Sequence, residues 1–126
     1  MGRILMRGAL AAALLALSSG PAFAGSPAQG AKVFASQCSA CHGNRANSPQ
    51  AVGPRLFGVV GRHAGTSPGY VYSPAMKGSG LVWTTDQLKV YLKSPAKVVH
   101  GTKMPYSGLN NPAQLEDLLA YLATLH

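Results

Sequence analysis

The sequence predicts a small all-α fold in which three main helices and long loops surround a large apolar ligand. Three segments carry helix signals, the stretch between residues 43 and 80 has no regular period, and residues 25–126 hold only a few clusters of large apolar residues. Ordering about 100 residues costs roughly 100–200 kcal/mol of conformational entropy. We therefore expect something besides leucine and valine to fill the centre.

The first 24 residues have the pattern of an export signal. Arg3 and Arg7 form a positive start, residues 9–17 are an apolar run, and residues 22–24 (Ala-Phe-Ala) are a typical cleavage site. The run is shorter than the ~20 apolar residues that a membrane-spanning helix needs, which excludes a polytopic membrane protein but leaves an uncleaved anchor open. We expect a cleaved signal peptide over 1–24, a single domain over 25–126 and location in the periplasm.

The first predicted helix begins at Ser26, a typical N-cap residue. A proline follows at the first helical position and Gln29 stands three residues after the cap. The helix is expected to run through Val33 and Phe34 towards Cys38.

The second predicted helix begins in the segment 84–87 (Thr-Thr-Asp-Gln). Leu88, Tyr91 and Leu92 share one face of it, and the Ser-Pro pair at 94–95 is expected to end it.

The third predicted helix has the strongest apolar periodicity. It begins at 111–114 (Asn-Pro-Ala-Gln), with Tyr121 beside the apolar stripe. The stripe consists of Leu115, Leu118, Leu119, Leu122 and Leu125.

Between residues 43 and 80, glycines and prolines interrupt every window. A structureless stretch of about 38 residues is unusual inside a compact domain. It becomes reasonable when the loop wraps a rigid object that replaces the missing core.

Residues 38–42 read Cys-Ser-Ala-Cys-His, the attachment pattern of a c-type haem. Thiols of Cys38 and Cys41, one helical turn apart, can each form a thioether with a haem vinyl group, and His42 then presents its imidazole to the iron. A redox dithiol lacks the expected βαβ context, a zinc site lacks a second ligand pair, and a disulfide closing so small a loop constrains little of the unfolded chain. The motif favours one covalent haem c.

The second axial ligand is a separate inference. Iron held by histidine alone has an open site, whereas His/Met ligation favours electron transfer. Only Met76 and Met104 follow residue 24. Position favours Met104, in the constrained loop after the second predicted helix, and leaves Met76 as the alternative.

From about Gly30 to Leu122 the chain resembles the class I cytochromes c, and among them most closely the bacterial cytochromes c2. The resemblance depends on the order and spacing of several landmarks. They are Gly30 and Phe34, the haem motif, the Gly53-Pro54-x-Leu56-x-Gly58-x-x-Gly61-Arg62 segment, Tyr72, Trp83, Tyr91-Leu92, the Gly101-Thr102-Lys103-Met104 segment and Leu118-x-Ala120-Tyr121-Leu122.

The resemblance implies a set of haem-binding residues. His42 and Met104 are implied as axial ligands, and Cys38 and Cys41 as thioether anchors. The Pro54 carbonyl is implied as acceptor from the second nitrogen of His42, a contact that fixes the ring and raises its basicity.

The remaining implied residues surround the haem. Arg62, Tyr72 and Trp83 are expected near one propionate and Thr102 near the other, while the Tyr91 phenol is expected near the methionine sulfur. The resemblance also places Gly30, Phe34 and Tyr121 at the crossing of the first and last helices, where a side chain on residue 30 would hold the backbones apart.

Three residues depart from the family pattern. Met76 stands where a polar residue, often asparagine, is common; Arg55 stands where asparagine is usual; and His100 stands where a proline often precedes the Gly-Thr-Lys-Met run. These departures bear on the buried hydrogen bonds and on the redox potential.

The expected function is that of a soluble periplasmic one-electron carrier, cytochrome c2-like and not an enzyme. The chain would act as a monomer between a cytochrome bc1-type donor and a reaction centre or terminal oxidase. Two alternatives remain open: a dedicated electron acceptor of a single periplasmic dehydrogenase, and an open-site haem enzyme or gas sensor if Met104 does not ligate. The three acids, Asp86, Glu116 and Asp117, lie on helical segments and suggest no acid/base catalysis.

The charge balance predicts acidic docking surfaces on the partners. The chain carries a net charge of +8, or +6 without Arg3 and Arg7, and lysines can steer association with an acidic partner. By resemblance, Lys93, Lys97 and Lys103 lie near the contact. Nucleic acid is a poor alternative, because no basic cluster is denser than two in five residues, and we expect no nucleic-acid partner.

Overall fold

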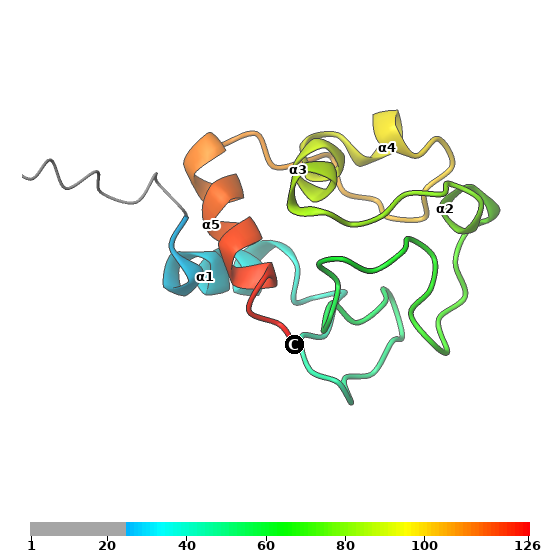
Figure 1. Cartoon of the computed structure of the whole chain (residues 1–126), viewed down its shortest axis with the longest axis horizontal. Coiled ribbons are helices and arrows are strands. Elements are labelled where there is room, and N and C mark those ends of the chain that lie inside the picture. Colours follow the sequence, from blue (N-terminus) through cyan, green and yellow to red (C-terminus); the bar gives the residue numbers. More distant parts are fainter. Residues whose placement is uncertain (1–24) are drawn as a thin grey trace, which may run out of the picture.

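The computed structural model describes residues 25–126, so the predicted signal peptide lies outside the described residues. Five helices follow one another along the chain: α1 (Pro27–Gln37), α2 (Pro74–Lys77), α3 (Thr85–Lys93), α4 (Pro95–Val98) and α5 (Pro112–Leu122). The only β-type pairing recorded in this part of the chain is an isolated bridge between His63 and Val82. The expectation of an all-α fold is confirmed (Figure 1).

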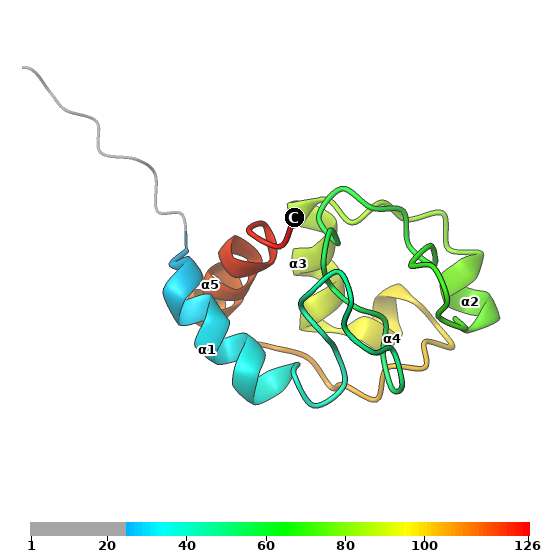
Figure 2. The ribbon, with the colours of Figure 1, turned by 90° about the horizontal axis from the view of Figure 1, so that it is seen from below.

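Helices α1 and α5 lie side by side at one end of the molecule in both views (Figures 1 and 2). A Cβ atom on Gly30 would lie 1.9 Å from the backbone oxygen of Asp117 and 2.6 Å from the Cβ of Tyr121. The Phe34 and Tyr121 rings pack with their centroids 5.4 Å apart. The predicted close crossing is confirmed, and it depends on the missing side chain at residue 30.

The three predicted helix starts are confirmed by their N-caps. Ser26 Oγ accepts from the backbone N–H of Gln29 at 3.2 Å, and Thr84 and Asn111 accept in the same way at the starts of α3 and α5. Each cap satisfies a backbone donor that the helix leaves unpaired.

The predicted apolar stripe of the last helix ends earlier than expected. Helix α5 stops at Leu122, so Leu125 lies beyond it, where its carbonyl accepts from the Gly58 N–H at 2.6 Å. Leu125 still packs against the core, but from a turn.

Helices α2 and α4 are single turns that the sequence analysis missed. Each begins at the proline of a Ser-Pro pair, and the Ser73 Oγ accepts from the Met76 N–H at 3.1 Å. The Ser-Pro pair at 94–95 does end α3 as predicted, and it then begins α4. Four residues contain too little of a helical period for the apolar pattern to reveal them.

The connection from residue 43 to residue 73 forms a long arc that leads from the end of α1 to α2 (Figure 2). Gln50 connects distant parts of this arc: its Oε1 accepts from Ser67 Oγ at 2.6 Å and from the Arg55 N–H at 3.0 Å, and its Nε2 donates to the Pro68 carbonyl at 2.7 Å.

Within residues 25–126, no helix is long and apolar enough to span a bilayer.

Candidate functional site

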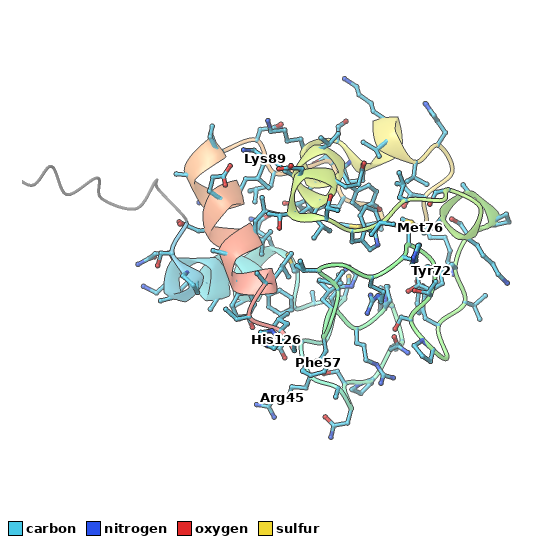
Figure 3. The ribbon with its side chains drawn as sticks, in the orientation of Figure 1. Arg45, Phe57, Tyr72, Met76, Lys89 and His126 are labelled. Carbon is cyan, nitrogen blue, oxygen red and sulfur yellow. The ribbon has the colours of Figure 1, made fainter. Side chains whose placement is uncertain are left out.

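One cavity of about 430 Å³ lies at the centre of the fold. Its lining comes from the end of α1, the long arc, helices α2, α3 and α5, and the loop 102–106. All ten residues that were predicted to bind the cofactor line it: Cys38, Cys41, His42, Pro54, Arg62, Tyr72, Trp83, Tyr91, Thr102 and Met104. Met76 lines it as well, and Figure 3 labels this residue together with Tyr72.

His42 is held by one short hydrogen bond in a fixed tautomer. The His42 Nδ1 lies 2.7 Å from the Pro54 carbonyl oxygen. A carbonyl can only accept, so Nδ1 carries the proton and Nε2 keeps its lone pair for a metal. Burial lowers the pKa of His42, while the bond to Pro54 raises it and the Arg62 charge lowers it further. The neutral ring that results is the form a metal binds.

Gly53 makes room for the His42 ring. A Cβ on Gly53 would lie 2.7 Å from the ring Cε1 and 2.9 Å from Nδ1. In the sequence, Gly53 stands out only as a landmark of the family. Its steric role becomes visible only when the arc and the haem motif are placed together.

Cys38 and Cys41 are free thiols that face the cavity. Burial raises the pKa of the Cys38 thiol to about 11, with a smaller contribution from Cys41. A protonated, buried thiol is a poor redox nucleophile, which weighs against the dithiol alternative. Nor do three His, Cys, Asp or Glu side chains of residues 25–126 come together to hold a metal such as zinc.

A closed ring of hydrogen bonds orients Met104. The Met104 N–H donates to Thr102 Oγ1 at 3.3 Å, Thr102 and Tyr91 share a hydroxyl–hydroxyl bond of 3.1 Å, and the Tyr91 hydroxyl donates to Met104 Sδ at 3.5 Å. Because the Tyr91 proton goes to sulfur, Thr102 is the donor to Tyr91. Burial raises the pKa of Tyr91, so this donor keeps its proton.

Met76 enters the cavity wall from α2 and is fixed through its backbone. Its N–H donates to Ser73 Oγ, and its carbonyl accepts from Ser79 Oγ at 2.8 Å. Half-buried, it packs against the apolar core. This is the usual gap-filling role of a methionine.

Arg62 brings spare hydrogen-bond donors to the cavity. Its Nη1 donates to the Phe57 carbonyl at 3.1 Å and its Nη2 to the Arg55 carbonyl at 3.2 Å. The Nε atoms of Arg62 and Arg55 are buried without a partner among the described residues. Burial lowers the pKa of Arg62, and a buried guanidinium with a free donor favours an anionic partner. In the sequence, Arg55 stands out only as a departure from the family pattern.

Two other predicted residues have different neighbours. The Tyr72 hydroxyl accepts from the Ser67 N–H at 3.0 Å. The buried Trp83 packs its ring on Tyr91 with centroids 4.9 Å apart. Their predicted propionate contacts remain predictions.

The cavity fits the group that the motif predicts. Its wall is mainly apolar and aromatic, as a porphyrin face requires, with two thiols and an imidazole nitrogen on one side and a held sulfur from the loop 102–106. The buried Nε of Arg62 supplies a donor for a carboxylate, and haem c carries two carboxylates on an otherwise apolar ring.

Two lysines, one of them (Lys103) expected near the docking contact, have partners inside the molecule. Lys103 Nζ donates to the Val71 carbonyl at 2.7 Å and lies 5.2 Å from the centroid of the Tyr70 ring. Lys89 forms an ion pair with Glu116 between α3 and α5, and Figure 3 labels it. Lys103 therefore fastens the loop 102–106 to the arc, which the sequence analysis did not anticipate because Val71 lies far away in the sequence.

Comparisons with known proteins agree with this geometry. The family model described as cytochrome c matches residues 27–126. A cytochrome c2 of Rhodopila globiformis is 47% identical over 106 residues, covering 84% of this chain and 99% of the relative, and one of Rhodomicrobium vannielii is 45% identical over 118 residues, covering 94% of each. The solved structure of cytochrome cH from Methylobacterium extorquens superposes with a TM-score of 0.74 at 46% identity, covering 79% of this chain and 99% of that one. The chain therefore belongs to the cytochrome c family, as a class I c-type cytochrome that resembles cytochrome c2.

Proposed function

We propose that the protein is a soluble, periplasmic, monomeric one-electron carrier whose haem is ligated by His42 and Met104. It would take electrons from a cytochrome bc1-type complex and pass them to a reaction centre or terminal oxidase. Family membership makes it an electron-carrier cytochrome with a covalent haem c. One observation supports ligation by His42 and Met104. Both residues line the same cavity, where hydrogen bonds leave the Nε2 of His42 free and orient the sulfur of Met104.

The haem supplies the one-electron Fe(III)/Fe(II) couple. The chain's part is to keep both ligands in place, so that the site rearranges little when the iron gains or loses an electron. The Pro54 carbonyl prevents the His42 ring from rotating, and the Thr102–Tyr91 pair keeps the Met104 sulfur directed inward. Thioether ligation raises the potential.

The lining supports electron transfer without substrate chemistry. None of the acids Asp86, Glu116 and Asp117 lines the cavity, so it offers no carboxylate as general acid or base. Each has a structural explanation: Asp86 lies in the first turn of α3, Glu116 pairs with Lys89, and Asp117 accepts from the Ser26 N–H at 2.7 Å.

Replacing each methionine in turn tests the ligand assignment. In the reduced holoprotein, Met104→Ala should open the iron to carbon monoxide and lower the potential, because a thioether favours ferrous iron. Met76→Ala is the matched control, since Met76 also lines the cavity; it should keep the near-infrared Met-to-iron band and stay closed to carbon monoxide. If wild type binds carbon monoxide freely, the open-site alternative holds; if the two variants exchange behaviour, Met76 is the ligand.

A further inference from the structure

The chain enters α1 through a close contact with α5. A Cβ atom on Gly25 would lie 2.1 Å from the Glu116 carbonyl oxygen and 2.5 Å from the Asp117 nitrogen, so residue 25 has room only for a glycine. Both of these atoms belong to the backbone of a helix and cannot move aside as a flexible side chain could. The position of Gly25 against α5 is therefore fixed by backbone packing.

The carboxylate of Asp117 lies at the start of α1. Its Oδ1 accepts from the backbone N–H of Ser26, the N-cap residue of α1, at 2.7 Å. The first turn of α1 contains no acidic side chain, so α5 supplies the negative charge that stabilises a helix N-terminus. Among residues 25–126, the Ser26 N–H is the only group that donates to this carboxylate. An ionised carboxylate offers about four lone-pair sites, so most of them remain available.

The backbone nitrogen of Gly25 lies close to the same carboxylate. Covalent geometry keeps two consecutive backbone nitrogens within about 3.6 Å of each other. Since the Ser26 nitrogen is 2.7 Å from Asp117 Oδ1, the Gly25 nitrogen is within about 6.3 Å of that oxygen. At this separation a positive charge on the Gly25 nitrogen would be attracted by Asp117, and Asp117 would also offset the unfavourable position of a cation at a helix N-terminus.

Such a charge arises when the chain is cut before Gly25. Residues 22–24 form the predicted cleavage site of the export signal. A peptidase of the export pathway would add water across the peptide bond between Ala24 and Gly25. The C–N bond breaks, Ala24 keeps a carboxylate, and the amine of Gly25 takes up the proton that is released and becomes an ammonium group. An uncharged amide is thereby converted into a cation.

We propose that the chain is cut between Ala24 and Gly25 and that the ammonium group formed on Gly25 is held by Asp117 as part of the contact between α1 and α5. The inference rests on the export that the proposed periplasmic location requires, and not on electron transfer. Removal of the leader then adds an ion pair to the folded protein that the uncut chain lacks.

The other charged groups on the packed helices are not placed to compete for this role. Glu116, the neighbour of Asp117 on α5, already pairs with Lys89 of α3. The nearest cation along α1 is Lys32, which is exposed in the second turn of the helix. Asp117 is therefore the carboxylate that the ammonium group of Gly25 would use.

The test measures the first residue of the mature protein and the reactivity of its amine. The holoprotein is expressed from the full-length gene and purified from the periplasm, and its intact mass identifies the first residue. It is then treated at pH 7 with succinimidyl acetate, which acetylates a free amine but not an ammonium group. Acetylation of Gly25 is followed by mass spectrometry, with Lys32 of the same protein as the internal reference.

Two acid-to-amide variants provide a matched pair. Asp117→Asn removes the charge and keeps a side-chain oxygen that can accept from the Ser26 N–H. Asp86→Asn is the control, because Asp86 lies in the first turn of α3. Gly25→Ala tests the packing: its methyl group cannot fit against Glu116, so the terminal residue should move away from Asp117 while the rest of the protein stays folded.

We expect the mature protein to begin at Gly25. At low salt its amine should react about three- to fivefold more slowly than that of Asp117→Asn, because Asp117 favours the protonated form. Gly25→Ala should react as fast as Asp117→Asn, and Asp86→Asn as slowly as wild type. Salt at about 1 M should remove most of the difference, which a purely steric shielding of the amine would not show.

Two results would overturn the inference. One is an intact mass that begins at another residue, and the other is an amine in Asp117→Asn that reacts no faster than in wild type. Neither result bears on haem ligation or electron transfer, which the methionine variants test separately. A failure of this inference is therefore distinguishable from a failure of the carrier function.

Discussion

Replacing Gly53 by alanine should displace the proximal histidine by a measurable amount. The new Cβ would lie 2.7 Å from the His42 Cε1, about 0.7 Å short of the 3.4 Å at which ordinary contact begins. The φ angle of Gly53 is not in the left-handed region, so alanine adds a steric clash without backbone strain. The ring must move away from residue 53, and therefore away from the neighbouring Pro54 carbonyl.

The size of the effect follows from two contributions. A 2.7 Å bond between His42 Nδ1 and the Pro54 oxygen, lengthened by about 0.7 Å, leaves hydrogen-bonding range, which costs ~1 kcal/mol. Overpacking of the buried site adds ~1–3 kcal/mol. Together these lower Tm by about 10–25 °C for a domain of this size. The imidazole also becomes less basic, which disfavours ferric iron. If the ferric state loses the full ~1 kcal/mol of the hydrogen bond, the redox potential rises by about 40 mV.

The assay compares Gly53→Ala with Gly78→Ala by thermal unfolding and by redox titration of the holoprotein. Gly78 is the control because its φ is −92° and its added Cβ would meet its nearest neighbour, the Pro74 carbonyl oxygen, at 3.2 Å. The control should keep wild-type potential and change stability by less than about 0.5 kcal/mol. If Gly53→Ala has the potential and Tm of the control, the close contact with His42 has no energetic role and the reasoning is refuted.

Three further changes test the fold and the site. Gly30→Ala gains up to ~1 kcal/mol in helix propensity but places a Cβ 1.9 Å from the Asp117 carbonyl oxygen. The clash should dominate, so the variant should unfold at a lower guanidinium concentration than wild type. A variant that unfolds at a higher guanidinium concentration would contradict this. Burial raises the pKa of Tyr91 above 10.0, so the unfolded state loses this proton first and the free energy of unfolding should fall as pH rises beyond about 10. Tyr91→Phe should flatten that fall when unfolding curves are measured at alkaline pH. If the free energy of unfolding of the variant falls with pH as steeply as that of wild type, Tyr91 is not the source of the fall. The Cys38→Ala/Cys41→Ala double variant, made without haem, should show no cooperative helical melt by circular dichroism, because the cavity at the centre of the fold would lack its apolar filling; a native-like melt would show that the protein part folds alone.

Helix starts were predictable because capping is local. Ser26, Thr84 and Asn111 each bond to a backbone N–H three residues later, and such a contact depends on a few adjacent residues. Helix ends and single turns were less predictable. Leu125 has the right spacing for α5 but lies beyond its end, because the backbone there turns and pairs with Gly58 from a distant part of the chain.

The sequence by itself determined the haem motif, the three main helices and the set of residues that would meet at one site, because these depend on short spacings and on a pattern shared along the whole chain. Only the tertiary structure showed that Gly53 lies against the His42 ring and that Thr102, Tyr91 and Met104 close a ring of hydrogen bonds. It also showed that Lys103 donates to the carbonyl of Val71, 32 residues away. These contacts join segments that no local periodicity relates. Their geometry is decided when the long arc closes over the central cavity.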